Sequence, residues 1–131
     1  MSDLPKGPAQ RILVVDDEES IRTFVTRALS EAGYEVIAAA DAREALKTAG
    51  ERRGEFDLLL TDLSMPGITG DELARQLRLG NPELKVLYLT AYSDRLFDSK
   101  ATLWQNEAFL DKPVTMKGLL EAVSLALFGH I

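Results

Sequence analysis

Cysteine is absent from this sequence of 131 residues, and histidine occurs only once, as His130. The lack of cysteine excludes disulfide bonds and thiol chemistry, and it is compatible with a reducing cytosol. Residues 1–10 contain no apolar run, so they form neither a signal peptide nor a membrane anchor. We therefore expect a cytoplasmic protein that does not insert into membranes and that starts with a flexible tail over residues 1–10.

Positively charged residues are also fewer than negatively charged ones. The chain has 15 Lys and Arg residues against 21 Asp and Glu residues, which gives a net charge of -6. An acidic surface repels phosphate backbones, so direct binding to nucleic acid is not expected. The composition, with 46% hydrophobic and 27% charged residues, is that of a globular protein, and the length fits one domain without a further output domain.

Short apolar runs alternate with stretches of helical periodicity from Arg11 onward. Most of these runs are apolar throughout, which is typical of strands in a parallel sheet that helices cover on both faces. The pattern predicts an α/β fold. The five expected strands are Ile12–Val15, Glu35–Ala39, Leu58–Thr61, Val86–Thr90 and Ala108–Leu110.

Helices are expected between the strands. Apolar residues from Ile21 to Leu29 lie on one helical face, and Gly33 follows as a stop signal. Asp41 and Glu44 have the spacing of a capping box, and they predict a second helix that ends before Gly50.

Two later helices have clear end signals. Leu73 marks a third helix, which Asn81-Pro82 ends, and Thr115 is the expected cap of the last one, in which Leu119, Val123 and Leu127 recur. The segment from Leu96 to Trp104 has few apolar positions and predicts only a marginally stable fourth helix.

Polar side chains collect where the expected strands end. Asp16 and Asp17 follow the first strand, Asp62 follows the third, Thr90 ends the fourth, and Lys112 comes shortly after the fifth. In an open parallel sheet the carboxyl ends of the strands meet at one edge, where ligands bind. We therefore expect three acids, a hydroxyl group and an ammonium group at the same edge.

Such a cluster of acids predicts a cation. Close carboxylates repel each other by roughly 1 to 4 kcal/mol per pair, which a divalent ion or shared protons offset. Ligands that are all oxygen atoms favour a hard ion such as Mg²⁺. A carboxylate beside Mg²⁺ can act as a nucleophile and form an acyl phosphate, and Asp62 is best placed for this because the turn Met65-Pro66-Gly67 exposes it.

Each feature also has a structural interpretation when it is taken alone. Acids before a helix stabilise its positive end, and Met65-Pro66-Gly67 is a common kind of turn. Thr90 is an ordinary strand residue, and Lys-Pro pairs are common. Their joint placement at the ends of different strands indicates a phosphoryl site.

Four segments resemble the response-regulator receiver family. They are Ile-Leu-Val-Val-Asp-Asp-Glu at residues 12–18, Leu-Leu-Leu-Thr-Asp-Leu-Ser-Met-Pro-Gly at 58–67, Leu-Thr-Ala at 89–91 and Phe-Leu-Asp-Lys-Pro at 109–113. The resemblance runs from Arg11 to about Phe128. It implies a flavodoxin-like, doubly wound fold with a five-stranded parallel sheet in the order 2-1-3-4-5, and a receiver domain over residues 11–129.

The resemblance also implies a function. A histidine kinase or phosphotransfer protein is expected to phosphorylate Asp62, and the protein catalyses no reaction beyond its own phosphotransfer and dephosphorylation. Lys112 is expected to contact the phosphoryl group, and the Lys112-Pro113 bond to be cis. The expected ligands of the Mg²⁺ or Mn²⁺ ion are Asp16, Asp17, Asp62 and the backbone carbonyl of Ser64.

A switch follows from the same resemblance. Thr90 and Phe109 match the family's switch pair, in which the hydroxyl group moves toward the phosphoryl group and the ring turns inward. The change is expected to reach a surface made by the fourth helix, fifth strand and fifth helix, where a downstream protein binds. The chain departs from the common pattern at Asn106-Glu107, where a glycine is frequent, and Ser64 and Tyr92 flank the expected pocket.

Several alternatives stay open. A hydrolase of the haloacid-dehalogenase type fits poorly, because Ser64 stands where that class has a second acid, and a flavin-binding relative lacks its phosphate loop after the first strand. A pseudo-receiver that ignores phosphate and a receiver taken from a hybrid kinase are further alternatives. His130 is expected to be a surface residue, not a phosphate carrier. A last set of residues forms either a partner surface or core: Leu96, Phe97, Trp104 and Phe128.

Overall fold

The computed structural model describes residues 9–52, 55–91 and 107–129. Strands and helices alternate along this part of the chain, and the expected helix from Leu96 to Trp104 lies outside it. The elements are β1 (Arg11–Val15), α1 (Glu19–Glu31), β2 (Glu35–Ala39), α2 (Ala42–Arg52), β3 (Leu58–Asp62), α3 (Gly70–Gly80), β4 (Lys85–Thr90), β5 (Glu107–Asp111) and α5 (Met116–Phe128).

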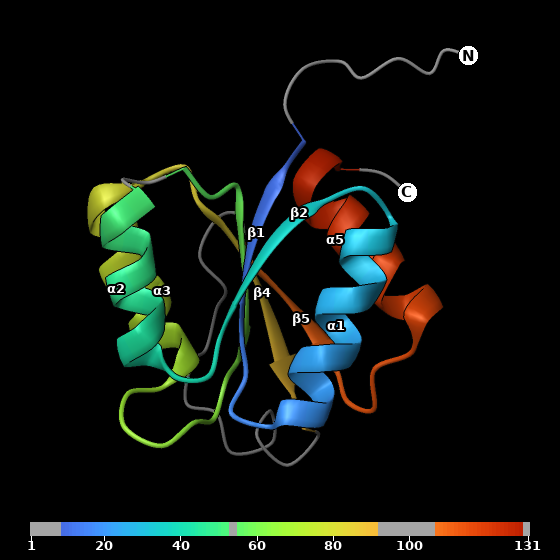
Figure 1. Cartoon of the computed structure of the whole chain (residues 1–131), viewed down its shortest axis with the longest axis horizontal. Helices are drawn as coiled ribbons and strands as arrows, with labels where there is room; N and C mark the ends of the chain where they lie inside the picture. The colour runs from blue at the N-terminus through green and yellow to red at the C-terminus, as the bar shows by residue number, and fades with distance from the viewer. Residues whose placement is uncertain (1–8, 53–54, 92–106, 130–131) are drawn as a thin grey trace.

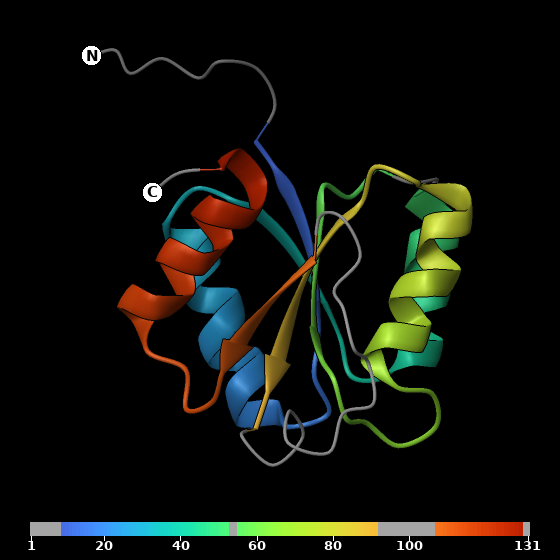
Figure 2. The ribbon, with the colours of Figure 1, turned by 180° about the vertical axis from the view of Figure 1, so that it is seen from behind.

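The strands form one parallel sheet between two layers of helices. Their order is β2-β1-β3-β4-β5, which confirms the expected topology. Helices α2 and α3 cover one face, and α1 and α5 cover the other (Figure 1). The view from behind shows β4 and β5 side by side between these layers (Figure 2). All five strands therefore end at the same edge of the sheet.

Alternate residues of each strand enter different hydrophobic layers. Leu13, Leu59 and Tyr88 pack on the side of α2 and α3, whereas Ile12 and Leu60 pack on the side of α1 and α5. Every residue of β3 is buried, as expected for the middle of a parallel sheet covered on both faces.

The helix ends agree with most of the local signals. Gly33 adopts a positive φ of 102° directly after α1, a conformation that glycine allows without strain. The side chain of Thr69 caps α3, and that of Thr115 accepts a hydrogen bond from the backbone of Gly118 at the start of α5, as the sequence predicted.

The prediction for α2 was right at its start and wrong at its end. Asp41 accepts a hydrogen bond from the backbone of Glu44, and Glu44 accepts one in return from Ala40, one residue before the expected donor. The helix does not stop before Gly50 but continues to Arg52. A glycine inside a helix weakens it by only about 1 kcal/mol relative to alanine, so packing against the sheet outweighs the local signal.

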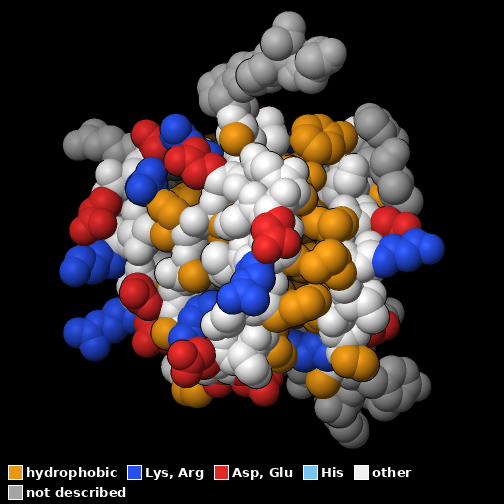
Figure 3. All heavy atoms as spheres, turned by 45° about the vertical axis from the view of Figure 1, so that its right-hand side comes forward, with side chains coloured by type: hydrophobic (Ala, Val, Ile, Leu, Met, Phe, Trp, Pro, Cys, Tyr) orange, Lys and Arg blue, Asp and Glu red, His pale blue; other side chains and the backbone are white. Residues whose placement is uncertain are grey.

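One side of the molecule carries exposed apolar side chains. Figure 3 shows hydrophobic groups gathered in a strip on the side where α1 and α5 lie. Phe24, Leu125 and Phe128 are among the exposed large hydrophobic residues. Phe128 is therefore exposed and not part of the core, whereas Leu96, Phe97 and Trp104 lie outside the described residues. Among the helices that the structure describes, none has the length and apolar character needed to cross a membrane.

Gly70, the first residue of α3, lies in close contact with the end of β3. The backbone N–H of Gly70 donates to the carbonyl of Leu63 at 2.8 Å. A Cβ atom on Gly70 would lie 3.1 Å from the Cα of Leu63, and closer still to the carbonyl oxygen of Asp62. A side chain at this position therefore has to push the helix away from the strand.

We expect opposite effects from alanine at two glycines. Gly70→Ala should lower the free energy of unfolding by about 1–3 kcal/mol because of this overlap with backbone atoms. Gly50→Ala is the matched control inside a helix, where a Cβ atom would meet no atom of the described residues within 4 Å, and it should raise that free energy by up to about 1 kcal/mol. Urea denaturation measures both. A Gly70→Ala protein as stable as the wild type would show that the close contact is absent.

Candidate functional site

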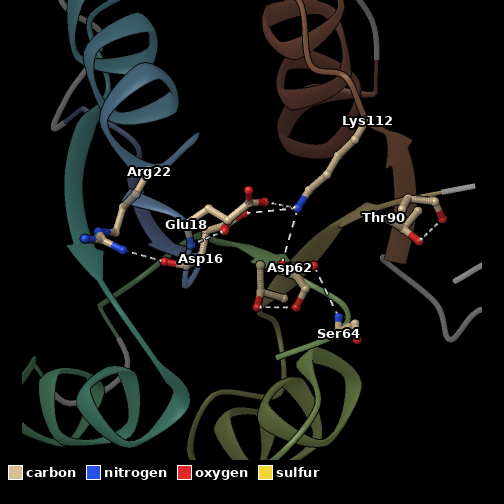
Figure 4. A network of polar contacts seen from close by, with 9 residues as sticks. Asp16, Glu18, Arg22, Asp62, Ser64, Thr90 and Lys112 are labelled. Carbon is tan, nitrogen blue, oxygen red and sulfur yellow. Dashed lines mark hydrogen bonds and ion pairs between the residues drawn. The ribbon is translucent and has the colours of Figure 1, made fainter. Parts of the chain in front are cut away.

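Three strand ends bring acids and an ammonium group together. Asp16 follows β1, Asp62 ends β3 and Lys112 follows β5, and Figure 4 shows the three side chains converging. The Lys112 Nζ atom lies 3.3 Å from Asp62 Oδ2 and 3.6 Å from Asp16 Oδ2. It also lies 3.4 Å from Glu18 Oε1. One positive charge therefore faces three carboxylates.

Asp62 is buried, so the expectation that the turn after it exposes this side chain was wrong. The local backbone orients the buried acids Asp16 and Asp62 in the same way. The N–H of Glu18 donates to Asp16 Oδ1 at 2.8 Å, and the N–H of Ser64 donates to Asp62 Oδ1 at 3.2 Å. In each case the donor lies two residues after the acid, as in an Asx-turn. The other oxygen of each carboxylate, Oδ2, is left to face Lys112.

Arg22 supports the same loop from α1. Its Nη1 atom donates to the backbone carbonyl of Asp16 at 2.7 Å. The backbone N–H of Asp16 donates to Ala39 at the end of β2 at 3.3 Å. Contacts on both sides thus hold the backbone of Asp16 in place.

The acid cluster suits a hard cation. Carboxylate oxygens of Asp16, Asp17 and Asp62 lie within 4.8 Å of one another, and Asp17 is exposed whereas the other two are buried. Asp16 Oδ2 is buried and has no hydrogen-bond partner among the described residues, although Lys112 Nζ lies 3.6 Å from it. A buried carboxylate oxygen without a donor, next to other carboxylate oxygens, matches the oxygen ligands that Mg²⁺ prefers.

Burial changes the proton affinities at the site. It raises the pKa of Asp62 to about 6, with a further increase from Asp16, while Lys112 acts in the opposite direction. Burial also raises the pKa of Asp16. Burial alone lowers the pKa of Lys112, but Asp62 and Asp16 outweigh it and the net shift is upward. Lys112 therefore stays charged, whereas ionised Asp62 is held at a cost in stability.

Thr90 on β4 and Phe109 on β5 lie on neighbouring strands but are not opposite each other in the register of the sheet. The buried Thr90 hydroxyl group donates to the carbonyl of Ala91 at 3.0 Å, and Figure 4 shows it apart from Asp62. The ring of Phe109 packs on that of Tyr88, with 5.4 Å between the centroids. The Lys112-Pro113 bond is cis, as expected. Tyr92 and Asn106 lie outside the described residues.

Sequence reasoning missed the roles of Glu18 and Arg22. Glu18 is the last residue of the segment at residues 12–18 that resembles the receiver family, but its contact with Lys112, 94 positions away, has no local signal. Arg22 lies four residues after Glu18 on α1, and this spacing could have suggested a neighbour of the site.

Fold and site together define an open, doubly wound α/β domain with a buried acidic cluster and a lysine at the carboxyl edge of its sheet. Comparison with known proteins agrees with this class. Residues 12–124 match the response regulator receiver domain. The chain belongs to this family.

Individual relatives cover the chain almost completely. This chain is 35% identical to the sensor kinase CckA of Brucella abortus. The match covers 86% of this chain but only 12% of that protein. The chain is 30% identical to the response regulator receiver protein CpdR of the same species, over 92% of this chain and 98% of that one. The chain spans about half of two further curated relatives, 46% and 56% of their lengths.

A solved structure bears on the site. The response regulator protein TrrA from Thermotoga maritima, crystallised in complex with Mg²⁺ and BeF, is 38% identical with a TM-score of 0.76. The match covers 90% of this chain and 99% of that one. Receiver domains of this family bind Mg²⁺ at an acidic pocket, and the acidic cluster of Asp16, Asp17 and Asp62 has the same character.

The raised pKa of Asp62 predicts a pH-dependent stability. Its pKa of about 6 in the folded protein lies above the ordinary value of 3.8, so the folded protein binds the proton more tightly than the unfolded chain does. Ionised Asp62 therefore destabilises the fold above pH 6, and this effect fades as the pH falls toward 4. In a chelator, Asp62→Asn should raise the free energy of unfolding by roughly 1–3 kcal/mol at pH 7.5 and by almost nothing at pH 4.

The control is Glu31→Gln, which removes an exposed carboxylate at the end of α1. It should change stability by no more than about 0.5 kcal/mol at either pH. Urea denaturation of the three proteins at both pH values measures the effect. A gain from Asp62→Asn that is the same at pH 4 and pH 7.5 would contradict the raised pKa.

Proposed function

We propose that the chain is a phospho-acceptor in a two-component phosphorelay and that Asp62 takes the phosphoryl group from a phosphohistidine. The observation that carries the proposal is the position of Asp62, buried at the end of β3 with Oδ2 3.3 Å from Lys112 Nζ. The match to the receiver family supports it. A sensor histidine kinase or a histidine phosphotransfer protein is the proposed donor.

The transfer is a displacement at phosphorus. A carboxylate oxygen of Asp62 attacks the phosphorus atom, so a P–O bond forms and the P–N bond of phosphohistidine breaks. The imidazole nitrogen leaves with the electron pair of the broken bond. Lys112, charged and at the same edge, donates to a phosphoryl oxygen and balances its negative charge.

Asp16, Asp17 and Asp62, together with the backbone carbonyl of Ser64, are the proposed ligands of a Mg²⁺ or Mn²⁺ ion. Such an ion neutralises charge between the incoming phosphoryl group and the carboxylates. Asp16 and Asp17 then position the metal, and Asp62 remains the nucleophile. The relative TrrA, solved with Mg²⁺ and BeF, supports this assignment.

Thr90 and Phe109 are the proposed switch. The Thr90 hydroxyl group would exchange its bond with the carbonyl of Ala91 for a bond with a phosphoryl oxygen. Phe109 would then reorient on β5 and change the surface that β5 and α5 present to a downstream protein. The expected contribution of the segment from Leu96 to Trp104 lies outside the described residues.

We propose that residues 11–129 form the receiver domain and that the protein works in the cytoplasm without direct contact to nucleic acid. Its proposed chemistry is limited to its own phosphotransfer and dephosphorylation. Most of the expected tail over residues 1–10 lies outside the described residues.

Incubation with acetyl phosphate and Mg²⁺ should add the mass of one phosphoryl group to the wild type, as intact-mass spectrometry detects. Asp62→Asn should show no gain because it lacks the nucleophile, and a chelator should abolish the gain of the wild type. Glu31→Gln is the matched control, and it should gain as much as the wild type. A folded wild type without any gain would favour the pseudo-receiver.

Mg²⁺ alone should stabilise the fold. At ten to a hundred times its Kd, a ligand that binds only the folded state raises the free energy of unfolding by about 1–3 kcal/mol. Asp17→Asn should lose most of this increase, because it removes one proposed ligand without disturbing the core, since Asp17 is exposed. Denaturation with and without Mg²⁺ measures the difference. An equal increase in both proteins would exclude Asp17 as a ligand.

A further inference from the structure

The proposed switch residue Phe109 lies against a fixed neighbour. In the register of the sheet Tyr88 on β4 is paired with Phe109 on β5, and Thr90 is paired with Asp111. The rings of Tyr88 and Phe109 are 5.4 Å apart and tilted by 35°. Tyr88 is fully buried on the side of α2 and α3, and Phe109 packs against the same hydrophobic layer. Any change in the position of Phe109 therefore changes its contact with Tyr88.

The hydroxyl group of Tyr88 is anchored. It donates to Glu107 Oε2 at 3.0 Å, and Arg78 Nη1 lies 3.1 Å from the same oxygen. The Glu107 side chain is only 2% exposed and that of Arg78 only 17%. A chain of contacts thus runs from α3 through Glu107 to the ring that touches Phe109.

Arg78 is itself tied to the backbone. Its Nε and Nη2 atoms donate to the carbonyl of Leu84 at 3.0 and 2.9 Å. The planar guanidinium group therefore joins α3 to the connection before β4 and to the start of β5 in one rigid arrangement.

Burial makes this arrangement hard to disturb. Removal of one partner from a buried ion pair leaves a charge without compensation, which is strongly destabilising. Burial and the negative charge of Glu107 both raise the pKa of Tyr88, so its hydroxyl group keeps the proton that it donates. Glu107 belongs to the dipeptide at which the sequence departs from the common receiver pattern.

We propose that Arg78, Glu107 and Tyr88 act as positioning residues for Phe109. Arg78 and Glu107 hold the Tyr88 ring in place, and contact with this ring keeps the Phe109 ring in its present position. The second part of the inference rests on the proposed function. If Phe109 reorients when Asp62 is phosphorylated, the anchored Tyr88 ring opposes that reorientation. A substitution that releases the Tyr88 ring then favours the reoriented state of Phe109. By linkage, this substitution tightens the binding of a phosphoryl analogue at Asp62 by the same factor.

The test removes only the anchoring hydroxyl group. Tyr88→Phe keeps the ring but cannot donate to Glu107, and Tyr34→Phe is the matched control, because Tyr34 packs in the hydrophobic layer on the other face of the sheet. With 4-fluorophenylalanine in place of Phe109, the ¹⁹F signal reports on this ring without any phosphoryl group. Tyr88→Phe should shift or broaden that signal, and Tyr34→Phe should leave it unchanged. A folded Tyr88→Phe protein with the wild-type signal overturns the positioning role.

Titration with beryllium fluoride in the presence of Mg²⁺ tests the second part. Tyr88→Phe should bind the analogue about fivefold more tightly than the wild type, whereas Tyr34→Phe should not differ from it. A residue with a merely structural role lowers stability but leaves this affinity unchanged, and that outcome overturns the coupling. If the ¹⁹F signal of Tyr88→Phe changes but the wild type does not bind the analogue, the positioning role is supported and the proposed phosphoryl site fails.

Discussion

The structure is organised around an electrostatic conflict at the carboxyl edge of its sheet. Parallel strands bury Asp16 and Asp62 beside each other, and Lys112 is close to both. Burial favours the neutral form of each acid, while the ammonium group favours the charged form, and burial prevails in the proton affinity of Asp62. The hydrophobic sheet thus supplies the free energy that keeps this unfavourable grouping in place. A cation bound as we propose would reduce the repulsion between these carboxylates.

Much of the fold could be predicted because its signals are local. Apolar runs of strand length alternated with helical periodicity, and Thr115 and Gly33 marked helix ends that the structure contains. The meeting of Asp16, Asp62 and Lys112 followed from topology alone, since parallel strands finish at one edge. Gly50 led to a wrong prediction of the end of α2, because the packing of α2 on the sheet outweighs a single weak helix former. The segment between β4 and β5 lies outside the described residues, so its expected helix stays a prediction.

The contacts that sequence could not predict depend on register. Tyr88 and Glu107 are 19 positions apart, and they meet because β4 and β5 pair with Tyr88 next to Phe109. A slip of β5 by one residue would turn Glu107 to the opposite face, away from Tyr88. Lys112 and Glu18 are separated by 94 positions and meet only when β1 and β5 are both in place. Residue type shows what such groups can do, but only the assembled sheet shows which of them are neighbours.

The division of the interior into two layers has a consequence for variation. The side chains of the two hydrophobic layers are separate sets, divided by the backbone of the sheet. Substitutions at distant positions in different layers should have additive effects on stability, whereas neighbours within one layer interact. Asp62 and its surroundings lie where both layers reach the same edge. Substitutions in the two layers can therefore accumulate with little influence on each other, and among the described residues we expect interactions between the layers mainly at the edge that holds Asp62.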